Sequence, residues 1–251
     1  MSKRKRLANE DWEMTSSSST DTDSDVEEIK TEKQQQKPCG LLFLPFEILS
    51  NIFILSSNPH LPIVCRQLYN RLYFAPNFIK LQFIMYRAHN DLPKAFEHAL
   101  RFPFFDMDLM HRFDNLNGKP IPYQDKKIPA RLFLSESNTL NDELVLALLE
   151  RGASPNRPKG YPLIKSAQLG RLDQVKLLIK YGADPTIRNN MALRVCAARN
   201  NRAMVDYFLD ELKVKPDSET LKVCVHRNLW DMIQVLVDHG AVPDMSTIND
   251  T

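Results

Sequence analysis

The sequence has little glycine and no long apolar segment. Glycine accounts for seven of the 251 residues, and no glycine-rich loop of the kind that cradles a phosphate group is present. No apolar run approaches the roughly 18 to 20 residues that a membrane span needs, and the N-terminus lacks the apolar core of a secretory signal. We therefore expect an intracellular protein, cytoplasmic, nuclear or both, with no membrane partner.

Clusters of metal-binding or catalytic residues are also missing. The four cysteines form no Cys-x-x-Cys pair, and the six histidines show no mutual spacing that suggests metal ligation. No nucleophile elbow or nucleotide loop is found. The net charge of +2 is too small to favour nucleic acid as the main partner. The sequence thus predicts a binding protein rather than an enzyme, with no cofactor and no metal.

The first 38 residues contain almost no apolar side chains. They run from a basic tetrad through a serine stretch into acidic and glutamine-rich segments, which predicts a disordered tail over residues 1–38. The tetrad has two interpretations, a nuclear-import signal or an ordinary solvated charge run; its residues are Lys3, Arg4, Lys5 and Arg6. Lys30 lies in the string IKTE, the pattern of a SUMO acceptor, which an acidic tail also produces by chance.

From residue 41 the composition turns abruptly apolar. The string LLFLPFEILSNIFIL is followed by a polar break and by LPIVCRQLYNRLY, so two short helices are expected. Pro45 suits a first helical turn, where its missing N–H is not needed, and Glu47 suits the positive end of the helix dipole. At helical spacing, Leu49, Ile52 and Phe53 share one face, and Ile48 lies beside them.

The order Leu-Pro-Phe-Glu-Ile-Leu, then Ile-Phe, then Val-Cys-Arg after the break resembles an F-box over residues 41–75. The resemblance implies binding to the Skp adaptor of a cullin-RING ubiquitin ligase, while the following domain chooses the substrate. It implies adaptor contacts by Leu44, Pro45, Glu47, Ile48, Leu49, Ile52, Phe53, Val64 and Cys65. The alternative is an apolar helical cap that seals the open end of a repeat domain.

Helical segments with a common ending recur along the rest of the chain. LVLALLERGASP, VKLLIKYGADP and MIQVLVDHGAVP each join an apolar helix to a Gly-Ala turn and a proline, and a further copy lacks the glycine. The equivalent helix positions are Val145, Val175, Val205 and Ile233. A preceding helix keeps its own register, with Leu163, Leu193 and Leu221 equivalent. Because residues 83–100 fit the same template, about five helix pairs are predicted.

Small residues and turn residues repeat in the same register. Ala167, Ala197 and Val225 are equivalent, and a small residue there allows neighbouring pairs to stack closely. The predicted turn positions can adopt the left-handed conformation; they are Gly170, Asn200 and Asn228, with Asp91 in the first pair. Cys196 and Cys224 are also equivalent, and we interpret them as buried core residues.

The Gly-Ala-Asp-Pro ending, the Tyr-Pro-Leu-Ile opening and the Ala167 position resemble ankyrin repeats over residues 78–246, with the best match in residues 161–185. The resemblance implies a protein-binding solenoid, and a shortened linker after Gly182 implies truncated β-hairpin fingers. The expected fold class is therefore all-α: F-box-like helices over residues 41–75, followed by an ankyrin-repeat α-solenoid.

The first two helix pairs lie farther apart in the sequence than the later ones, so an insertion is expected at about residues 102–129. Its aromatic residues are candidate contacts for a target protein, because long loops on repeat scaffolds often carry recognition and aromatics dominate interface hot spots. The alternative is that they fill a poorly packed first repeat, since apolar aromatics are usually buried. These candidates are Phe104, Phe105, Phe113 and Tyr123.

Two functions are consistent with these patterns. The first is a substrate-recognition adaptor of an SCF-type cullin-RING ubiquitin ligase, in which the F-box-like helices bind a Skp-type adaptor and the repeats bind an unknown protein substrate. The second is an ankyrin-repeat scaffold or regulatory binding protein with no link to a ligase, whose N-terminal helices cap the stack.

Overall fold

The chain divides into two units, residues 1–39 and residues 40–251. The computed structural model describes residues 40–134 and 139–244, except for the side chains of Thr139 and Leu140. The predicted tail over residues 1–38 therefore lies outside the described residues. Within the described ranges the regular elements are helical, and the one isolated β-bridge joins Lys127 to Ser154. The all-α fold class is confirmed.

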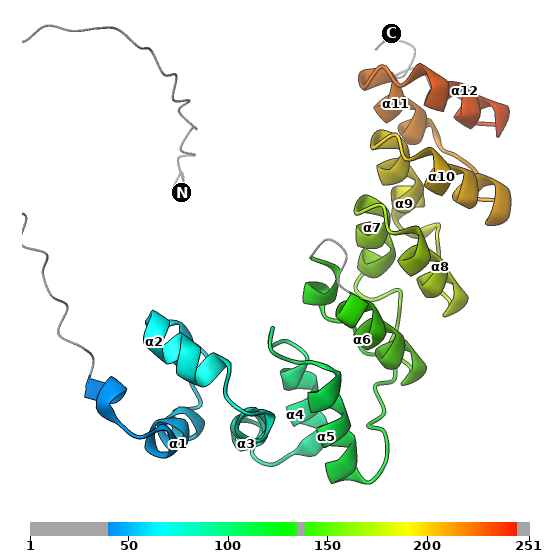
Figure 1. Cartoon of the computed structure of the whole chain (residues 1–251). Coiled ribbons are helices and arrows are strands. Elements are labelled where there is room, and N and C mark those ends of the chain that lie inside the picture. Colours follow the sequence, from blue (N-terminus) through cyan, green and yellow to red (C-terminus); the bar gives the residue numbers. More distant parts are fainter. Residues whose placement is uncertain (1–39, 135–138, 245–251) are drawn as a thin grey trace, which may run out of the picture. The chain divides into compact units, whose positions relative to one another are not determined.

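The first segment of the second unit folds into short helices (Figure 1). They are η1 (Gly40–Phe43), α1 (Phe46–Ser56), η2 (Leu61–Ile63), α2 (Arg66–Leu68) and η3 (Tyr69–Tyr73). Pro45 stands immediately before α1, where its fixed φ of −53° leads into the helix without breaking a hydrogen bond. At α2, Cys65 takes the N-cap position, and its Sγ accepts a hydrogen bond from the Leu68 amide at 3.5 Å.

Helix α1 packs on α3 (Asn77–Arg87), the first helix of the repeat region. The rings of Phe53 and Phe83 stack with centroids 4.2 Å apart, nearly parallel. Arg71 of η3 donates hydrogen bonds to the carbonyls of Leu42 and Leu44, at 3.0 and 3.1 Å. These contacts hold the segment before α1 close to η3 and attach the N-terminal helices to the first repeat.

The remaining helices follow the predicted pairs. The second pair is irregular, because its first member is a 3-10 helix of four residues. The pairs are α3 and α4 (Leu92–Ala99), η4 (Ala130–Phe133) and α6 (Thr139–Glu150), α7 (Tyr161–Gln168) and α8 (Leu172–Lys180), α9 (Ile187–Ala198) and α10 (Arg202–Asp206) continued by η5 (Tyr207–Glu211), and α11 (Ser218–His226) and α12 (Trp230–Asp238). The predicted insertion contains a full helix, α5 (Met107–Asn117), and not only a loop.

The first helices of the last three pairs stack side by side, α7 against α9 and α9 against α11 (Figure 1). The equivalent leucines Leu163, Leu193 and Leu221 are buried between them. Ala167 and Ala197 are also buried, as expected for positions where helices approach closely. At the equivalent position Val225 remains half-buried, because no further pair follows α12 within the described residues.

The turns between paired helices use left-handed residues at the predicted positions. Gly170, Asn200 and Asn228 have φ values of 75°, 55° and 54°. In the first pair the prediction at Asp91 is wrong, since Asn90 takes the left-handed conformation with φ 59°. Asp91 instead accepts a hydrogen bond from the Lys94 amide as the N-cap of α4.

Apart from residues 100–129, which contain α5, the linkers between pairs are short, and none contains a strand within the described residues. Before α9 the linker ends in three successive left-handed residues, Arg188, Asn189 and Asn190, with φ values of 53° to 59°. Regular α-helical geometry therefore starts at Met191, although the assigned span begins at Ile187. Asn90, Asn200 and Asn228 show the same preference, because asparagine tolerates this conformation better than most residues.

Candidate functional site

The predicted adaptor-binding residues within α1 lie on two sides of this helix, one buried and one exposed. Leu49 and Phe53 are 0% and 3% exposed, and both belong to the common hydrophobic core. The prediction that these two contact an adaptor is therefore wrong: the same helical face that the sequence pattern identifies is turned toward α3. The other side is accessible, with Pro45, Glu47 and Ile48 exposed.

The remaining predicted adaptor residues are at least partly accessible. Val64 is 68% exposed, and Leu44, Ile52 and Cys65 are half-buried. The sequence pattern missed two neighbours, Phe43 at 75% exposure and Ile63 at 64%. We call Phe43, Ile48 and Val64 the N-terminal apolar set. Exposed residues of this size mark interaction surfaces when they recur in one region, because water solvates them poorly.

Three of the predicted target-binding aromatics are core residues. Phe105, Phe113 and Tyr123 are 2%, 0% and 3% exposed, and all three rings pack against the ring of Phe96 with centroids 5.7 to 6.0 Å apart. Their prediction as direct target contacts is wrong, because a buried ring is inaccessible to a partner. The alternative, that they fill the first repeat, describes the observed packing. Phe104 is half-buried and lines a cavity.

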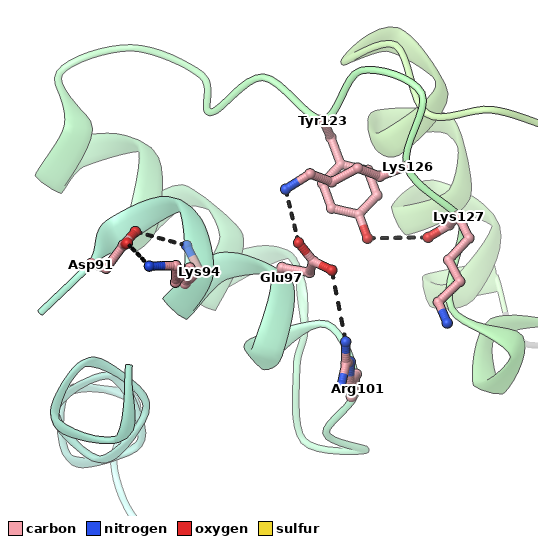
Figure 2. Close-up of polar contacts among 7 residues, drawn as sticks. All are labelled: Asp91, Lys94, Glu97, Arg101, Tyr123, Lys126 and Lys127. Carbon is pink, nitrogen blue, oxygen red and sulfur yellow. Dashed lines mark hydrogen bonds and ion pairs between the residues drawn. The ribbon is translucent and has the colours of Figure 1, made fainter. Parts of the chain in front are cut away.

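The loop after α5 is fastened to α4 by polar contacts (Figure 2). Glu97 of α4 accepts a hydrogen bond from Lys126 at 2.8 Å and pairs more distantly with Arg101 at 3.7 Å. The hydrogen bond from Lys126 holds the pKa of Glu97 below its ordinary value. The Tyr123 hydroxyl donates to the Lys127 carbonyl at 3.1 Å, and burial raises the Tyr123 pKa to about 12. Tyr123 is thus a neutral anchor of this loop.

A bidentate ion pair joins α5 to the end of α6. Arg151 donates to the two carboxylate oxygens of Asp114 at 2.9 and 2.6 Å, and the side chains are 11% and 15% exposed. Asp114 also accepts a hydrogen bond from the Ile121 amide, and the Arg151 guanidinium lies 5.5 Å from the centre of the Phe96 ring. The inserted helix is therefore an integral part of the repeat packing.

An apolar cavity of about 330 Å³ lies where the N-terminal helices meet the first repeat. Its walls are mainly prolines, aliphatic side chains and aromatic rings, and they come from four segments: Phe53 of α1, residues 59–63, residues 72–83 and residues 102–104. The one side chain with a permanent charge in this lining is Lys80. We call this cavity the aromatic groove.

The two cysteines of the repeats are inert core residues. Cys196 and Cys224 are both 0% exposed, and burial raises their pKa values to about 12 and about 11. The thiolate, which is the reactive form, is therefore strongly disfavoured at both positions. This confirms their interpretation as core residues.

The remaining predicted sites belong to the N-terminal tail. The basic tetrad Lys3, Arg4, Lys5 and Arg6 and the acceptor Lys30 lie outside the described residues. Among residues 40–134 and 139–244, no group of three or more His, Cys, Asp or Glu side chains is arranged to hold a metal ion. In the same ranges, no helix combines the length and apolar character needed to cross a membrane.

Comparison with known proteins identifies the most regular part of the chain. The family model described as Ankyrin repeat matches residues 161–190, which contain α7 and α8. An uncharacterized protein of Schizosaccharomyces pombe is 20% identical over an alignment of 251 positions, which covers 82% of this chain and 85% of that protein. No solved structure matches. An ankyrin repeat is a protein-interaction module without catalytic chemistry, so this stretch gives the chain a protein-binding role.

Proposed function

We propose that this chain is a substrate-recognition adaptor of an SCF-type cullin-RING ubiquitin ligase. In this proposal the helices of residues 41–75 bind a Skp-type adaptor, and the repeat region, residues 78–246, binds the protein substrate. The chain supplies proximity, and the ubiquitin-transfer chemistry belongs to its partners.

The exposure of the N-terminal apolar set is the observation that supports this proposal most. The segment already buries Leu49 and Phe53 against the first repeat, so its attachment to the repeats is satisfied. A helical cap that only seals a solenoid is expected to present a polar outer surface. Phe43, Ile48 and Val64 instead remain 75%, 48% and 68% exposed, which favours a second protein as their partner.

A plain ankyrin-repeat scaffold is the second candidate, and a different observation favours it. The parallel stacking of Phe53 on Phe83 at 4.2 Å, with α1 packed along α3, is the contact expected of a cap. In that case the N-terminal helices only protect the end of the repeat stack, and the chain has no link to a ligase.

Co-purification with a Skp-type adaptor distinguishes the two functions. The full-length chain is compared with the Ile48→Asp variant, and Val237→Asp provides the matched control, because Val237 is 45% exposed and Ile48 48%. We expect the parent and the control to retain the adaptor and Ile48→Asp to lose it, since a charge in a desolvated apolar contact costs several kcal/mol. If the parent itself retains no adaptor, the scaffold function replaces the ligase function.

A further inference from the structure

The aromatic groove combines an apolar wall with a single cation. Tyr73, Phe102 and Phe104 form part of the wall, with the Phe102 and Phe104 rings stacked 5.0 Å apart and the Tyr73 ring edge-on to Phe104 at 6.3 Å. Lys80 enters from α3, and its ammonium nitrogen lies 5.4 Å from the centre of the Phe104 ring. The groove thus offers apolar contact and a positive charge side by side.

Lys80 is only partly compensated within the described residues. Its ammonium donates a hydrogen bond to the Asn77 side-chain oxygen at 3.3 Å, but no described carboxylate lies within 4.0 Å of it. Burial lowers the Lys80 pKa, while Asp106 acts on it through space in the opposite direction. A partly desolvated ammonium of this kind gains from a close carboxylate, because charge-assisted hydrogen bonds are stronger than neutral ones.

The size of the groove and its rim favour a polypeptide over a small molecule. A volume of about 330 Å³ is at the lower end of small-molecule sites, so one large side chain is a suitable occupant. The apolar surface continues from the cavity onto its rim: Ile63 of the lining is 64% exposed, and Phe74, edge-on to Tyr73 at 5.4 Å, is 68% exposed. A peptide that inserts one side chain covers this rim with its neighbouring residues.

We propose that the aromatic groove binds a short segment of a partner protein that inserts a phenylalanine or similarly large apolar side chain and places an acidic side chain next to Lys80. We identify the partner as the ligase substrate, and only this identification rests on the proposed function. The groove then selects peptides that carry a large apolar side chain next to an acidic one. The ammonium group of Lys80 pairs with the acidic side chain.

Fluorescence anisotropy of the full-length chain tests this selection. The probes are fluorescein-labelled nonapeptides in a glycine-serine background: one with a central phenylalanine flanked by aspartates, one with the same phenylalanine flanked by lysines, and one with a central serine flanked by aspartates. We expect the parent to bind the first at least tenfold more tightly than either of the others, since one charge-assisted contact or one buried ring contributes a factor of this size.

Reversal of the groove charge gives the sharpest result. Lys80→Glu should invert the preference, so that the lysine-flanked phenylalanine peptide binds about tenfold more tightly than the aspartate-flanked one. Such a gain also shows that the variant is folded. Lys176→Glu is the matched control, because Lys176 also lies over an aromatic ring, 5.2 Å from that of Tyr207, but on α8; it should keep the parental preference.

Each other outcome overturns the groove proposal. It fails if the parent binds none of the peptides, if flanking charge has no effect, or if Lys176→Glu changes the preference as much as Lys80→Glu. Adaptor co-purification with the same proteins separates this failure from that of the proposed function. Peptide selection without adaptor binding removes the ligase link and leaves the groove, whereas adaptor binding without peptide selection removes the groove alone.

Discussion

The two halves of the described chain achieve close packing in different ways. The repeats from α7 to α11 stack through alanine, leucine and cysteine in a constant register, and among residues 141–229 no large apolar side chain is exposed. The part before residue 134 is packed by aromatic rings around Phe83 and Phe96 and leaves the N-terminal apolar set in contact with water. Residues 141–229 have thus used their large apolar side chains internally, and exposed ones reappear only from Trp230 onward, at the end of the described stack. The irregular half leaves such side chains exposed throughout its length.

This difference predicts opposite sensitivities to mutation. An aromatic core responds most to the loss of volume, because rigid neighbours leave a cavity when a ring is removed. A stack built on small residues responds most to added volume, because the helices have no room to move apart. The following substitutions test this contrast, in order of decreasing expected effect.

Truncation of Phe96 should be the most destabilising of these changes. Phe96 is 1% exposed, and its ring contacts Phe105, Phe113 and Tyr123. We expect Phe96→Ala to lower the free energy of unfolding by about 4 kcal/mol, measured by urea unfolding followed by far-UV circular dichroism. Phe74→Ala, which removes the same ring from a position 68% exposed, should cost less than about 1 kcal/mol. Equal losses would show that the Phe96 cluster does not determine stability.

Removal of the charge on Asp114 tests the attachment of α5. Asp114→Asn leaves the Arg151 guanidinium, 11% exposed, without its anionic partner, so we expect a loss of about 3 kcal/mol in the free energy of unfolding. The control is Asp206→Asn in the exposed pair with Arg202, where we expect less than about 0.5 kcal/mol. A similarly small effect at Asp114 would mean that α5 packs independently of this ion pair.

The sequence predicts the regular half well and the irregular half poorly, for a physical reason. Periodicity identified Leu163, Leu193 and Leu221, all of them buried, as equivalent positions and Asn200 and Asn228 as turn residues, because the same local environment recurs in each repeat. No such redundancy exists before residue 134. There the insertion formed helix α5, and burial was decided by contacts between segments distant in sequence.

The candidate sites were also predicted poorly wherever they depend on contacts between segments distant in sequence. The apolar pattern of α1 identified its buried face correctly, but it did not reveal whether a partner or α3 covers that face. The aromatic groove was not predicted at all, because its walls come from four separate segments. Phe53, singled out in the apolar pattern of α1, and Phe104, singled out as an aromatic of the insertion, provided separate local signals for it.

Added volume in the regular half should have an intermediate effect. Ala197 is 0% exposed on α9, which packs between α7 and α11, so Ala197→Leu forces the neighbouring helices apart. We expect a loss of about 2 kcal/mol in the free energy of unfolding. Ala203→Leu introduces the same side chain at an exposed position of α10 and should be nearly neutral. If both variants are neutral, the stack tolerates expansion and the proposed contrast between the halves is lost.

The smallest expected effect is a pH dependence at the end of the regular half. His239, which follows α12, has Nε2 at 3.0 Å from an Asp210 carboxylate oxygen and Nδ1 at 2.8 Å from the Val235 carbonyl oxygen. Both neighbours accept hydrogen bonds, and only the protonated imidazole donates from both nitrogens. The hydrogen bond to Asp210, followed by that to Val235, raises the His239 pKa above its ordinary value.

A raised pKa in the folded state contributes stability that is complete below the unfolded-state pKa of about 6.5 and is lost as the pH rises through the folded-state value. We therefore expect His239→Gln to reduce the free energy of unfolding more at pH 6 than at pH 8.5, by an amount that urea unfolding at the two pH values measures. In the Asp210→Asn variant, an NMR titration of His239 should give a lower pKa than in the parent, since the largest cause of the shift is removed. An equal effect of His239→Gln at both pH values would mean that the stability contributed by the two ring contacts does not depend on the imidazole charge.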